Sequence, residues 1–498
     1  MREKLLSLPL TELKALAKAG GVKGVSGLKK EALVDALIAE DARRKEAEAA
    51  VVAAAEEKSK VIVYRGDRPS RNAAIEEVDP SSGEQGKVSK VEAKSAEEAY
   101  SQNAEAQAGG QRQNTTNEGY VPQEGDQAAT GILEVMPDGF GFIRSDNYLP
   151  GENDIYVSPQ QIRSFRLRTG DILTGVKRAK GEKEKFSPLS YLELVNNRPA
   201  KEALKRVNFE NMTPIFPDKR IKLETPGCKV AMRAMDLVSP VGYGQRGMIV
   251  SPPKAGKTTL LKEIAHSMLA NDPETHMIIL LIDERPEEVT DIKEAIIGKN
   301  VEVIYSTFDE QPEHHIRVAE MVIERARRLV EQNEDVVILL DSITRLTRAY
   351  NQVIPPSGRT LSGGLDPAAL HMPKRFFGAA RNMREGGSLT VLATALVETG
   401  SKMDDVVYEE FKGTGNMEIV LDRKLSERRI FPAIDLAKSG TRREDLLMDK
   451  DELEAITIMR KALNGLKPDE ATDRILDMFS KTRNNQDFVR LVKSNKFL

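Results

Sequence analysis

The sequence predicts a multidomain protein whose largest part is an α/β domain with a doubly wound parallel sheet. Two observations favour this fold class. Six apolar runs typical of buried strands alternate with stretches of helical periodicity in residues 229–498. Five shorter β-type runs, separated by Gly, Pro, Asn and Asp, occupy residues 130–200 and indicate a small five-stranded β-barrel ahead of the α/β domain.

Length, charge and cysteine content set the limits for any function. At 498 residues the chain is long enough for about three domains. Its formal net charge is only -3, so attraction to nucleic acid has to come from local patches. A single cysteine, Cys228, excludes a disulfide framework and a cysteine-rich metal site. No apolar run is long enough to span a bilayer and the amino end lacks a signal-peptide core, so we expect a cytoplasmic protein without membrane contact.

The region before the barrel divides into two segments of different composition. Residues 1–42 carry apolar residues at helical spacing, interrupted by glycines, and predict a small helical module. Residues 43–129 are rich first in Ala and Glu and then in Ser, Gln, Asn and Gly, without any Phe or Trp. Such a composition buries too little apolar surface to offset the entropy of ordering, which predicts a flexible linker. After the barrel at 130–200 we expect a connector at 201–228.

The barrel region carries an aromatic motif, Asp138-Gly-Phe-Gly-Phe-Ile-Arg144. Side chains alternate along a strand, so Phe140 and Phe142 fall on one face, and the glycines beside them leave room around the rings. Stacking of a base on such a ring contributes about 1–3 kcal/mol, while Arg144 would contact a phosphate or a base edge. Further cations available for phosphates are Arg163, Arg166, Arg168, Lys177, Arg178, Lys180, Lys183 and Lys185. The motif predicts binding of single-stranded nucleic acid; a structural barrel with solvated charges is the alternative.

The α/β region contains the predicted strands, one long helix and two loops. The strands are Met248–Val250, Met277–Ile282, Val301–Ser306, Val336–Leu340, Leu389–Leu396 and Met417–Leu421. In a doubly wound sheet of this kind a ligand binds at the carboxyl ends of the strands. Apolar spacing predicts the long helix over Gln311–Asn333. A loop rich in Pro, Gly and Ser spans Ile354–Pro367, and Gly400-Ser-Lys402 forms a second loop after a strand; long loops in compact domains tend to carry function.

The stretch from Ser251 to Thr259, Ser-Pro-Pro-Lys-Ala-Gly-Lys-Thr-Thr, lies between a strand-like and a helix-like run. This is the context of a phosphate-binding loop, in which backbone N–H groups and the positive end of the helix face an anion. Lys257 would reach the terminal phosphates and the Thr258 hydroxyl would hold Mg²⁺. The nucleotide-binding residues predicted from this loop are Pro253, Lys254, Ala255, Gly256, Lys257, Thr258 and Thr259. The general pattern has a glycine where this chain has Ser251.

Two of the predicted strands end in acidic residues. The strand Val336–Leu340 delivers Asp341 to the carboxyl edge of the sheet, where such a carboxylate supports Mg²⁺ in phosphate-loop enzymes. The strand Met277–Ile282 ends in Asp283-Glu284-Arg285, and Glu284 beside a triphosphate could polarise an attacking water. A structural, salt-bridged Glu284 is the alternative. Loop and acids together predict a nucleoside triphosphate hydrolase.

Taken together, these segments resemble the bacterial transcription termination factor Rho family. The resemblance covers the barrel and the α/β domain, about three quarters of the chain, and also the short helical module. Rho-like phosphate loops do not keep the first glycine, so Ser251 fits the resemblance. The segments that carry it are Asp138–Phe142, Asp154–Pro159, Leu167–Asp171, Pro252–Thr258, Leu281–Thr290, Leu340–Arg345, Pro373–Arg381 and Tyr408–Asn416.

The resemblance implies a hexameric, RNA-stimulated ATPase that uses ATP and Mg²⁺, translocates along RNA and dismantles transcription complexes. It implies an OB or cold-shock-like barrel that binds pyrimidine-rich single-stranded RNA, and a RecA-type fold for the α/β domain. The implied partners are further copies of the chain, the RNA polymerase elongation complex and Nus-type elongation factors.

The resemblance also assigns residues. Glu284 would orient the attacking water, Lys257 would act on the phosphates, and Arg442 would be an arginine finger that reaches the ATP of a neighbouring subunit, with Arg429 and Arg285 at the same site. The implied RNA-binding residues of the barrel are Phe140, Phe142, Arg144, Tyr156, Glu184, Lys185 and Phe186. The implied RNA-binding residues of the central pore are Arg359, Thr360, Gly363, Gly364, Ser401 and Lys402. Compact members carry Glu-Arg-Tyr where this chain has Glu-Lys-Phe at 184–186, which keeps a ring and a cation.

Two other classes of protein share part of this pattern. A catalytic subunit of a rotary ATP synthase has the same kind of α/β domain but lacks a barrel built on Phe140, Phe142 and Arg144. A non-enzymatic RNA-binding protein needs neither Lys257 nor Glu284. Both remain alternatives at the level of the sequence.

Overall fold

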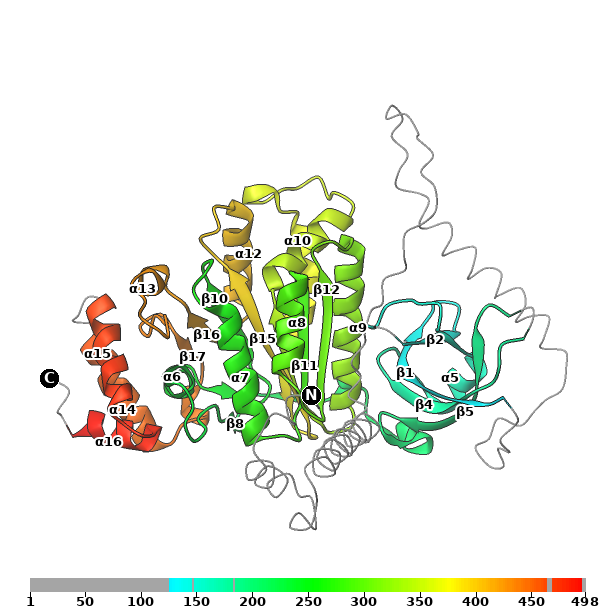
Figure 1. Cartoon of the computed structure of the whole chain (residues 1–498), viewed down its shortest axis with the longest axis horizontal. Helices are drawn as coiled ribbons and strands as arrows, with labels where there is room; N and C mark the ends of the chain where they lie inside the picture. Colours follow the sequence, from blue (N-terminus) through cyan, green and yellow to red (C-terminus); the bar gives the residue numbers. More distant parts are fainter. Residues whose placement is uncertain (1–124, 146, 182–183, 464–467, 495–498) are drawn as a thin grey trace, which may run out of the picture. The chain divides into compact units, whose positions relative to one another are not determined.

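The computed structural model describes residues 125–498 except 146, 182–183, 464–467 and 495–498 (Figure 1). The predicted helical module at 1–42 lies outside the described residues, as does the predicted linker up to residue 124. Among the described helices, none combines the length and the apolar character needed to cross a bilayer.

The barrel predicted between residues 130 and 200 is confirmed. Its strands are β1 (Gln127–Val135), β2 (Gly141–Arg144), β3 (Ile155–Val157), β4 (Ile172–Lys177) and β5 (Ser187–Val195). They follow the order β3-β2-β1-β4-β5, and pairing of β3 with β5 closes the barrel. Two boundaries differ from the prediction. Strand β1 begins at Gln127, inside the segment assigned to the linker, and β2 begins after Phe140.

The barrel interior is apolar, and close backbone approach requires glycine in one strand. Leu133, Ile143 and Leu173 are fully buried in its core. A Cβ atom on Gly175 would lie 2.0 Å from the carbonyl oxygen of Tyr191, so β4 and β5 pair closely only because position 175 lacks a side chain. Helix α5 (Pro159–Phe165) lies between β3 and β4 in the chain and begins with a capping box formed by Ser158 and Gln161.

The α/β domain contains all six parallel strands that the sequence predicts. They are β10 (Arg246–Ser251), β11 (His276–Glu284), β12 (Val301–Thr307), β13 (Asp335–Asp341), β15 (Ser388–Leu396) and β16 (Met417–Val420). The order is β12-β11-β13-β15-β10-β16, and every neighbouring pair is parallel. The sheet is mixed at its margins, because the short strands β14 (Arg381–Met383) and β17 (Gly440–Thr441) pair antiparallel with β15 and β16.

Helices cover both faces of this sheet, as a doubly wound fold requires. On one face, Ile279, Leu281 and Val337 pack with α6 (Val230–Val238), α7 (Lys257–Asn271) and α8 (Pro286–Ala295). The long helix α9 and the helix α10 also contact the sheet strands (Figure 1). Their bounds are α9 (Pro312–Val330) and α10 (Ile343–Val353), so α9 is shorter at both ends than the predicted Gln311–Asn333.

Three helices complete the carboxyl end of the α/β domain: α14 (Lys450–Leu463), α15 (Pro468–Ser480) and α16 (Asn485–Lys493). Arg233 of α6 donates hydrogen bonds to the carbonyl oxygens of Phe479, Thr482 and Asn484, each at 2.7 Å. The rings of Phe479 and Phe488 stack with centroids 3.9 Å apart. These contacts attach α15 and α16 to each other and to α6.

Candidate nucleotide and RNA sites

The predicted phosphate loop connects β10 to α7. Gly256 forms the amino-terminal cap of α7 with φ 93°, and Lys254 also has a positive φ of 65°. Lys257 is therefore the first helical residue, at the positive end of a 15-residue helix. Pro253, Lys254 and Thr259 are exposed, Gly256 and Thr258 are half-buried, and Ala255 is buried. This arrangement offers backbone N–H groups and a helix terminus to an anion.

Lys257, Glu284 and Asp341 meet at the carboxyl edge of the sheet. The Lys257 ammonium donates hydrogen bonds to Glu284 Oε1 at 2.9 Å and to Asp341 Oδ1 at 2.6 Å. Glu284 ends β11 and Asp341 ends β13, and both carboxylates are almost fully buried. The Thr394 hydroxyl of β15 donates to the same oxygen, Asp341 Oδ1, at 2.8 Å and so helps to fix that carboxylate. Three sequence-distant residues predicted for one site therefore lie in direct contact.

The charges in this cluster shift one another's protonation. Burial works against the charged form of Lys257, but Asp341 and Glu284 outweigh it and raise the pKa of Lys257. Burial and the negative charge of Asp341 raise the pKa of Glu284, although Lys257 acts to lower it. A carboxylate with a raised pKa is a stronger proton acceptor, as a general base requires. Glu284 is salt-bridged to Lys257, as the structural alternative supposes, and it ends β11 at the carboxyl edge of the sheet.

The oxygen donors of this site fit Mg²⁺. Asp341 supplies a carboxylate and Thr258 supplies a hydroxyl, which are the hard ligands that this ion prefers. In the part of the chain that the structure describes, no group of three or more His, Cys, Asp or Glu side chains is arranged to hold a metal by itself. Mg²⁺ commonly takes only one or two carboxylates and completes its shell with phosphate oxygens and water.

Helix α10 contributes two arginines that the sequence analysis did not assign. Arg345 lies 3.4 Å from an Asp283 oxygen and 3.8 Å from a Glu284 oxygen. Arg348 contacts Asp404 Oδ1 at 2.7 Å, and the Thr399 hydroxyl donates to the other Asp404 oxygen at 2.6 Å. Residues three apart share one side of a helix, so the spacing of the two arginines after Asp341 is the signal that could have found them. Helix α10 thus contacts both the cluster around Lys257 and Asp404, which follows the loop at 400–402.

A cleft of about 580 Å³ opens beside the phosphate loop. Gly256 and Thr259 line one part of it, and Phe431 and Pro432 line another. Cys228 lies in the same wall and is half-buried, in line with a small filler residue. Phe431 is 55% exposed, which is unusual for a large aromatic side chain and leaves a ring surface available for stacking. The sequence analysis missed Phe431, because no local pattern brings residue 431 next to residue 256.

The three remaining arginines assigned to catalysis are exposed. Arg285 caps the amino end of α8, Arg429 has a positive φ of 61°, and Arg442 follows β17. The backbone of Arg442 is fixed, since its N–H donates to the carbonyl oxygen of Asn416 at 2.8 Å. Within the described residues, none of these side chains forms a hydrogen bond or ion pair with the cluster around Lys257.

The two loops predicted to grip RNA lie against each other. Gly363 has φ 79°, and a Cβ atom there would lie 2.4 Å from the backbone nitrogen of Met403. Only glycine permits this contact between the 354–367 loop and the start of α12 (Lys402–Lys412). The other residues assigned to these loops are exposed or half-buried: Arg359, Thr360, Gly364, Ser401 and Lys402. The loops therefore form one surface, although Gly363 and Met403 are 40 positions apart in the chain.

The aromatic residues of the barrel form a cluster of their own, separate from its core. The centroids of the Phe140 and Phe142 rings are 5.6 Å apart, and those of Phe142 and Tyr156 are 6.2 Å apart. Phe186, from the segment before β5, packs its ring 5.0 Å from Phe142. The three rings Phe140, Phe142 and Tyr156 are only 4–8% exposed. The rings share one face as predicted, but they pack on one another and are not open to solvent.

The prediction that Arg144 offers its charge to a phosphate does not match its surroundings. Arg144 is 4% exposed and its guanidinium lies 4.8 Å from the centroid of Phe142. Its Nε donates to Glu134 at 2.7 Å and its Nη1 donates to the buried Asp154. With two carboxylates bound, this cation is neutralised inside the barrel. The position of Arg144 at the end of the aromatic motif gives no information about these partners.

In the segment at 184–186 the charge of Glu184 is paired, whereas the charge of Lys185 is exposed. Glu184 accepts hydrogen bonds from Arg178 and from the backbone N–H of Gly181, the latter at 2.9 Å. Burial acts to raise the pKa of Glu184, but Arg178 and Gly181 lower it overall. Lys185 is exposed and lies 5.5 Å from the centroid of the Phe186 ring. Arg178, offered above as a phosphate contact, is thus engaged by Glu184.

Known proteins match both domains of the chain. The RNA-binding domain of the Rho termination factor matches residues 129–201, and the nucleotide-binding domain of the ATP synthase alpha/beta family matches residues 231–441. The first match coincides with the barrel and the second with most of the α/β domain.

Curated relatives extend over both domains at once. Transcription termination factor Rho of Bacillus subtilis is 59% identical over 359 residues, which is 72% of this chain and 83% of the relative. The Thermotoga maritima protein of the same name is 56% identical over 74% of this chain and 86% of its own length. The Pseudomonas aeruginosa protein is 55% identical over 73% of this chain and 87% of its own length. The chain therefore belongs to the transcription termination factor Rho family.

Proposed function

We propose that this chain is an RNA-dependent ATPase that binds single-stranded nascent RNA, moves along it as a hexameric ring and terminates transcription by RNA polymerase. One observation carries the proposal. The Lys257–Glu284–Asp341 cluster at a phosphate loop and a ring-bearing barrel that matches the Rho RNA-binding domain occur in the same chain.

Hydrolysis of ATP follows from the geometry of the cluster. The γ-phosphoryl group carries most of its charge on oxygen, and Lys257 at the start of α7 compensates that charge in a site with little water. Glu284, whose pKa is raised, accepts the proton of the attacking water as the water oxygen bonds to the γ-phosphorus, and the bond from that phosphorus to the bridging oxygen breaks to release ADP. Asp341 and Thr258 would hold Mg²⁺, which neutralises phosphate charge when bound. Phe431 stacks on the base of the nucleotide.

Recognition of RNA belongs to the ring cluster and the paired loops. The barrel offers Phe140, Phe142, Tyr156 and Phe186 for stacking with the bases of pyrimidine-rich RNA once the rings separate. Because Arg144 is held by Glu134 and Asp154, we assign it the role of orienting Phe142 instead of contacting phosphate.

The loop surface formed by Gly363 and Lys402 grips RNA in the pore of the ring, where it comes close to α10 and hence to the hydrolysis site. Arg442, exposed on a fixed backbone, is suited to reach the ATP of a neighbouring subunit, and Arg429 and Arg285 assist at this interface. The further partners of the chain are the RNA polymerase elongation complex and Nus-type elongation factors. The chain acts in the cytoplasm.

The two alternatives account for less of the chain. A rotary ATP synthase subunit explains the match at 231–441 but not a barrel that matches an RNA-binding domain. A non-enzymatic RNA-binding protein explains the barrel, but not a lysine between two buried carboxylates at the edge of a parallel sheet.

ATP turnover with and without single-stranded RNA separates the three functions. We expect Mg²⁺-dependent turnover that rises severalfold with oligocytidine RNA, and release of the transcript from a stalled RNA polymerase elongation complex in the presence of ATP. Turnover that ignores RNA would favour the rotary subunit. RNA binding without turnover would favour the non-enzymatic protein.

A further inference from the structure

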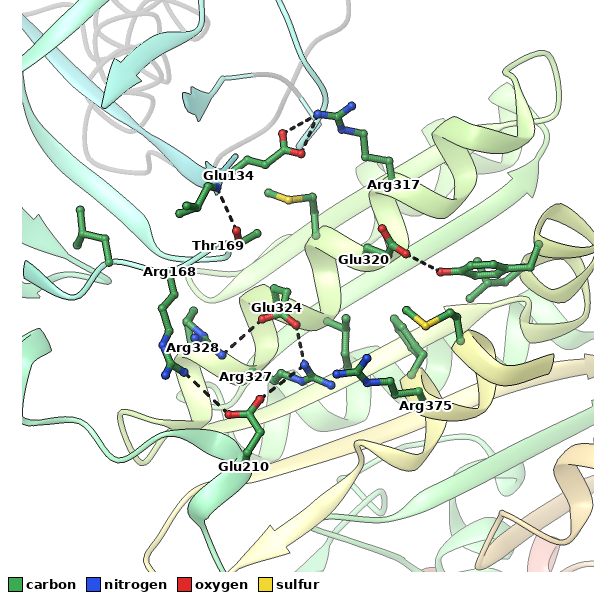
Figure 2. A pocket seen from close by; sticks show the side chains of 18 residues that line it. Glu134, Arg168, Thr169, Glu210, Arg317, Glu320, Glu324, Arg327, Arg328 and Arg375 are labelled. Atoms are coloured by element: carbon green, nitrogen blue, oxygen red, sulfur yellow. Dashed lines mark hydrogen bonds and ion pairs between the residues drawn. The ribbon is translucent and has the colours of Figure 1, made fainter. Parts of the chain in front are cut away.

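The carboxylate of Glu134 is one of the groups that join the barrel to the α/β domain. Glu134 of β1 accepts a hydrogen bond from Arg144 Nε at 2.7 Å, within the barrel. The same carboxylate accepts two hydrogen bonds from Arg317 Nη2 of α9, at 2.7 and 2.8 Å (Figure 2). Burial acts to raise the pKa of Glu134, but Arg144 and Arg317 lower it overall, so Glu134 is ionised and holds both cations.

The barrel end of this contact reaches the aromatic cluster. The Arg144 guanidinium lies 4.8 Å from the Phe142 ring centroid, and its other arm is held by the buried Asp154. Phe142 in turn contacts the rings of Phe140, Tyr156 and Phe186. A continuous series of contacts therefore runs from the rings through Arg144 and Glu134 to α9.

RNA binding has to disturb this series. A base that stacks on a ring covers one of its faces, and the faces of Phe140, Phe142 and Tyr156 are 92% or more buried against neighbouring groups. The rings must separate to admit a base. Displacement of the Phe142 ring alters the position of Arg144, which rests on that ring, and so alters the contact between Arg144 and Glu134.

The other end of the series reaches the hydrolysis site. Helix α9 follows β12, and just before it the Phe308 N–H donates to the carbonyl oxygen of Glu284 at 3.1 Å. One turn after Arg317, Glu320 accepts a hydrogen bond from the Tyr350 hydroxyl of α10 at 3.1 Å. Helix α9 is thus attached to the strand that carries Glu284 and to the helix that leads into the 354–367 loop.

The surroundings of the Glu134–Arg317 pair allow it to move. A cavity of about 710 Å³ lies between barrel residues such as Thr169 and the face of α9, and the pair lies at its wall (Figure 2). The Glu134–Arg317 pair lies beside this cavity, whereas the close contact between the barrel and α9 lies further along the helix, where a Cβ atom on Gly170 would be 2.4 Å from the carbonyl carbon of Glu324. Densely packed interfaces resist small displacements, whereas a pair beside a cavity can shift without disrupting a core.

We propose that Arg317 is a positioning residue that transmits RNA binding in the aromatic cluster to ATP hydrolysis, through its contact with Glu134. The inference rests on the proposed function and adds the route by which the two sites communicate. Arg317 touches neither RNA nor nucleotide. Through Glu134 and Arg144 it makes the position of α9 depend on the arrangement of the aromatic rings.

A matched pair of variants tests this route in the full chain. Arg317→Gln removes the contact with Glu134 and leaves Arg144 in place. Arg198→Gln removes a second ion pair between the barrel region and the α/β domain, from Arg198 to Glu334 at 2.6 Å, which has no connection to the rings. For each variant, the affinity for fluorescent oligocytidine is measured by anisotropy, and ATP turnover is measured with and without saturating oligocytidine.

We expect Arg317→Gln to lower the stimulation of turnover by RNA about fivefold, the lower end of typical coupling between two sites, with RNA affinity and basal turnover within about twofold of the unaltered chain. Arg198→Gln should leave the stimulation unchanged. Arg317→Lys should restore part of it, because lysine keeps the charge but not the planar guanidinium.

Undiminished stimulation in Arg317→Gln would overturn the inference. An equal loss in Arg198→Gln would also overturn it, since any weakening of the attachment between barrel and α/β domain would then suffice. If the unaltered chain hydrolyses ATP without any response to RNA, the proposed function itself fails, and that result is distinguishable from the others because it needs no variant.

Discussion

Replacing Glu284 by glutamine separates binding of ATP from its hydrolysis. Glutamine has the shape of glutamate and keeps an oxygen that can accept the hydrogen bond from Lys257, now 2.9 Å away. Lys257 also keeps Asp341 at 2.6 Å, so the ammonium stays in place at the start of α7. What glutamine lacks is the ability to take a proton from water. We therefore expect Glu284→Gln to change chemistry and not the structure of the site.

The size of the effect follows from the role of a general base. Proton transfer by a positioned side chain contributes about 10²–10⁴-fold to a rate, which corresponds to about 2.7–5.5 kcal/mol of activation free energy. ATP turnover by Glu284→Gln should fall by at least about 10²-fold, while the dissociation constant for ATP stays within a few-fold. Turnover is followed by phosphate release at saturating ATP and RNA, and affinity by equilibrium binding of a fluorescent ATP analogue.

The control for this experiment lies three residues further along the chain. Glu287 is exposed in the first turn of α8, and Glu287→Gln makes the same change of charge and shape. It should leave turnover unchanged. If Glu284→Gln instead lost ATP affinity and kept normal turnover per bound nucleotide, Glu284 would be a metal or structural residue and the assignment of the base would be wrong.

Four further predictions concern the subunit interface, the base cleft and the barrel. Mixing Arg442→Ala with Lys257→Ala subunits should restore part of the lost turnover, because an arginine finger from a neighbour contributes about 10³–10⁵-fold; co-assembled mixtures that stay inactive would argue for a site within one chain. Phe431→Ala should raise KM for ATP about tenfold with kcat unchanged, since stacking of a base on a ring contributes about 1–3 kcal/mol; a change confined to kcat would contradict the stacking role. Arg144→Ala should lower the free energy of unfolding of the barrel, measured by hydrogen exchange, by about 3 kcal/mol, because Asp154 loses its buried partner whereas Glu134 keeps Arg317. If the barrel stayed stable and the salt dependence of RNA binding became flatter, Arg144 would be a phosphate contact after all. Folding lowers the pKa of Glu134, so the ionised carboxylate stabilises the protein fully above its ordinary pKa of 4.5, and this stabilisation is lost as the pH falls through the lowered pKa. Glu134→Gln should therefore lower the free energy of unfolding at pH 7 and lower it less in acid. If urea unfolding gave the same loss of free energy at both pH values, the prediction would be wrong.

Much of the fold could be predicted because each domain repeats one simple pattern. Continuous apolar runs such as Val336–Leu340 report burial on both faces of a parallel strand, and all six such runs became neighbouring strands. The phosphate loop and the two acidic strand ends could be combined into one site, because the carboxyl ends of parallel strands meet at one edge. The antiparallel strands β14 and β17 are too short to give any periodicity, and the sequence analysis did not foresee them.

The sites could be predicted only as far as a residue's role depends on its own segment. Alternation along a strand places Phe140 and Phe142 on one face, but it does not say what covers that face, and the ring of Phe186 arrives from 44 residues away. The surroundings of Arg144 are likewise set by residues outside its own strand, Glu134 on β1 and Asp154 just before β3. Phe431 likewise lies in the cleft beside the phosphate loop only because of long-range packing.

Simultaneous measurement of ATP turnover and RNA binding by the unaltered chain and by Lys257→Ala tests the central claim most directly. The claim is that the cluster of Lys257, Glu284 and Asp341 hydrolyses ATP in response to RNA held by the barrel. We expect the unaltered chain to hydrolyse ATP faster with oligocytidine than without it, and Lys257→Ala to bind the same RNA while turnover falls to background. Near-normal, RNA-stimulated turnover in Lys257→Ala would contradict the account.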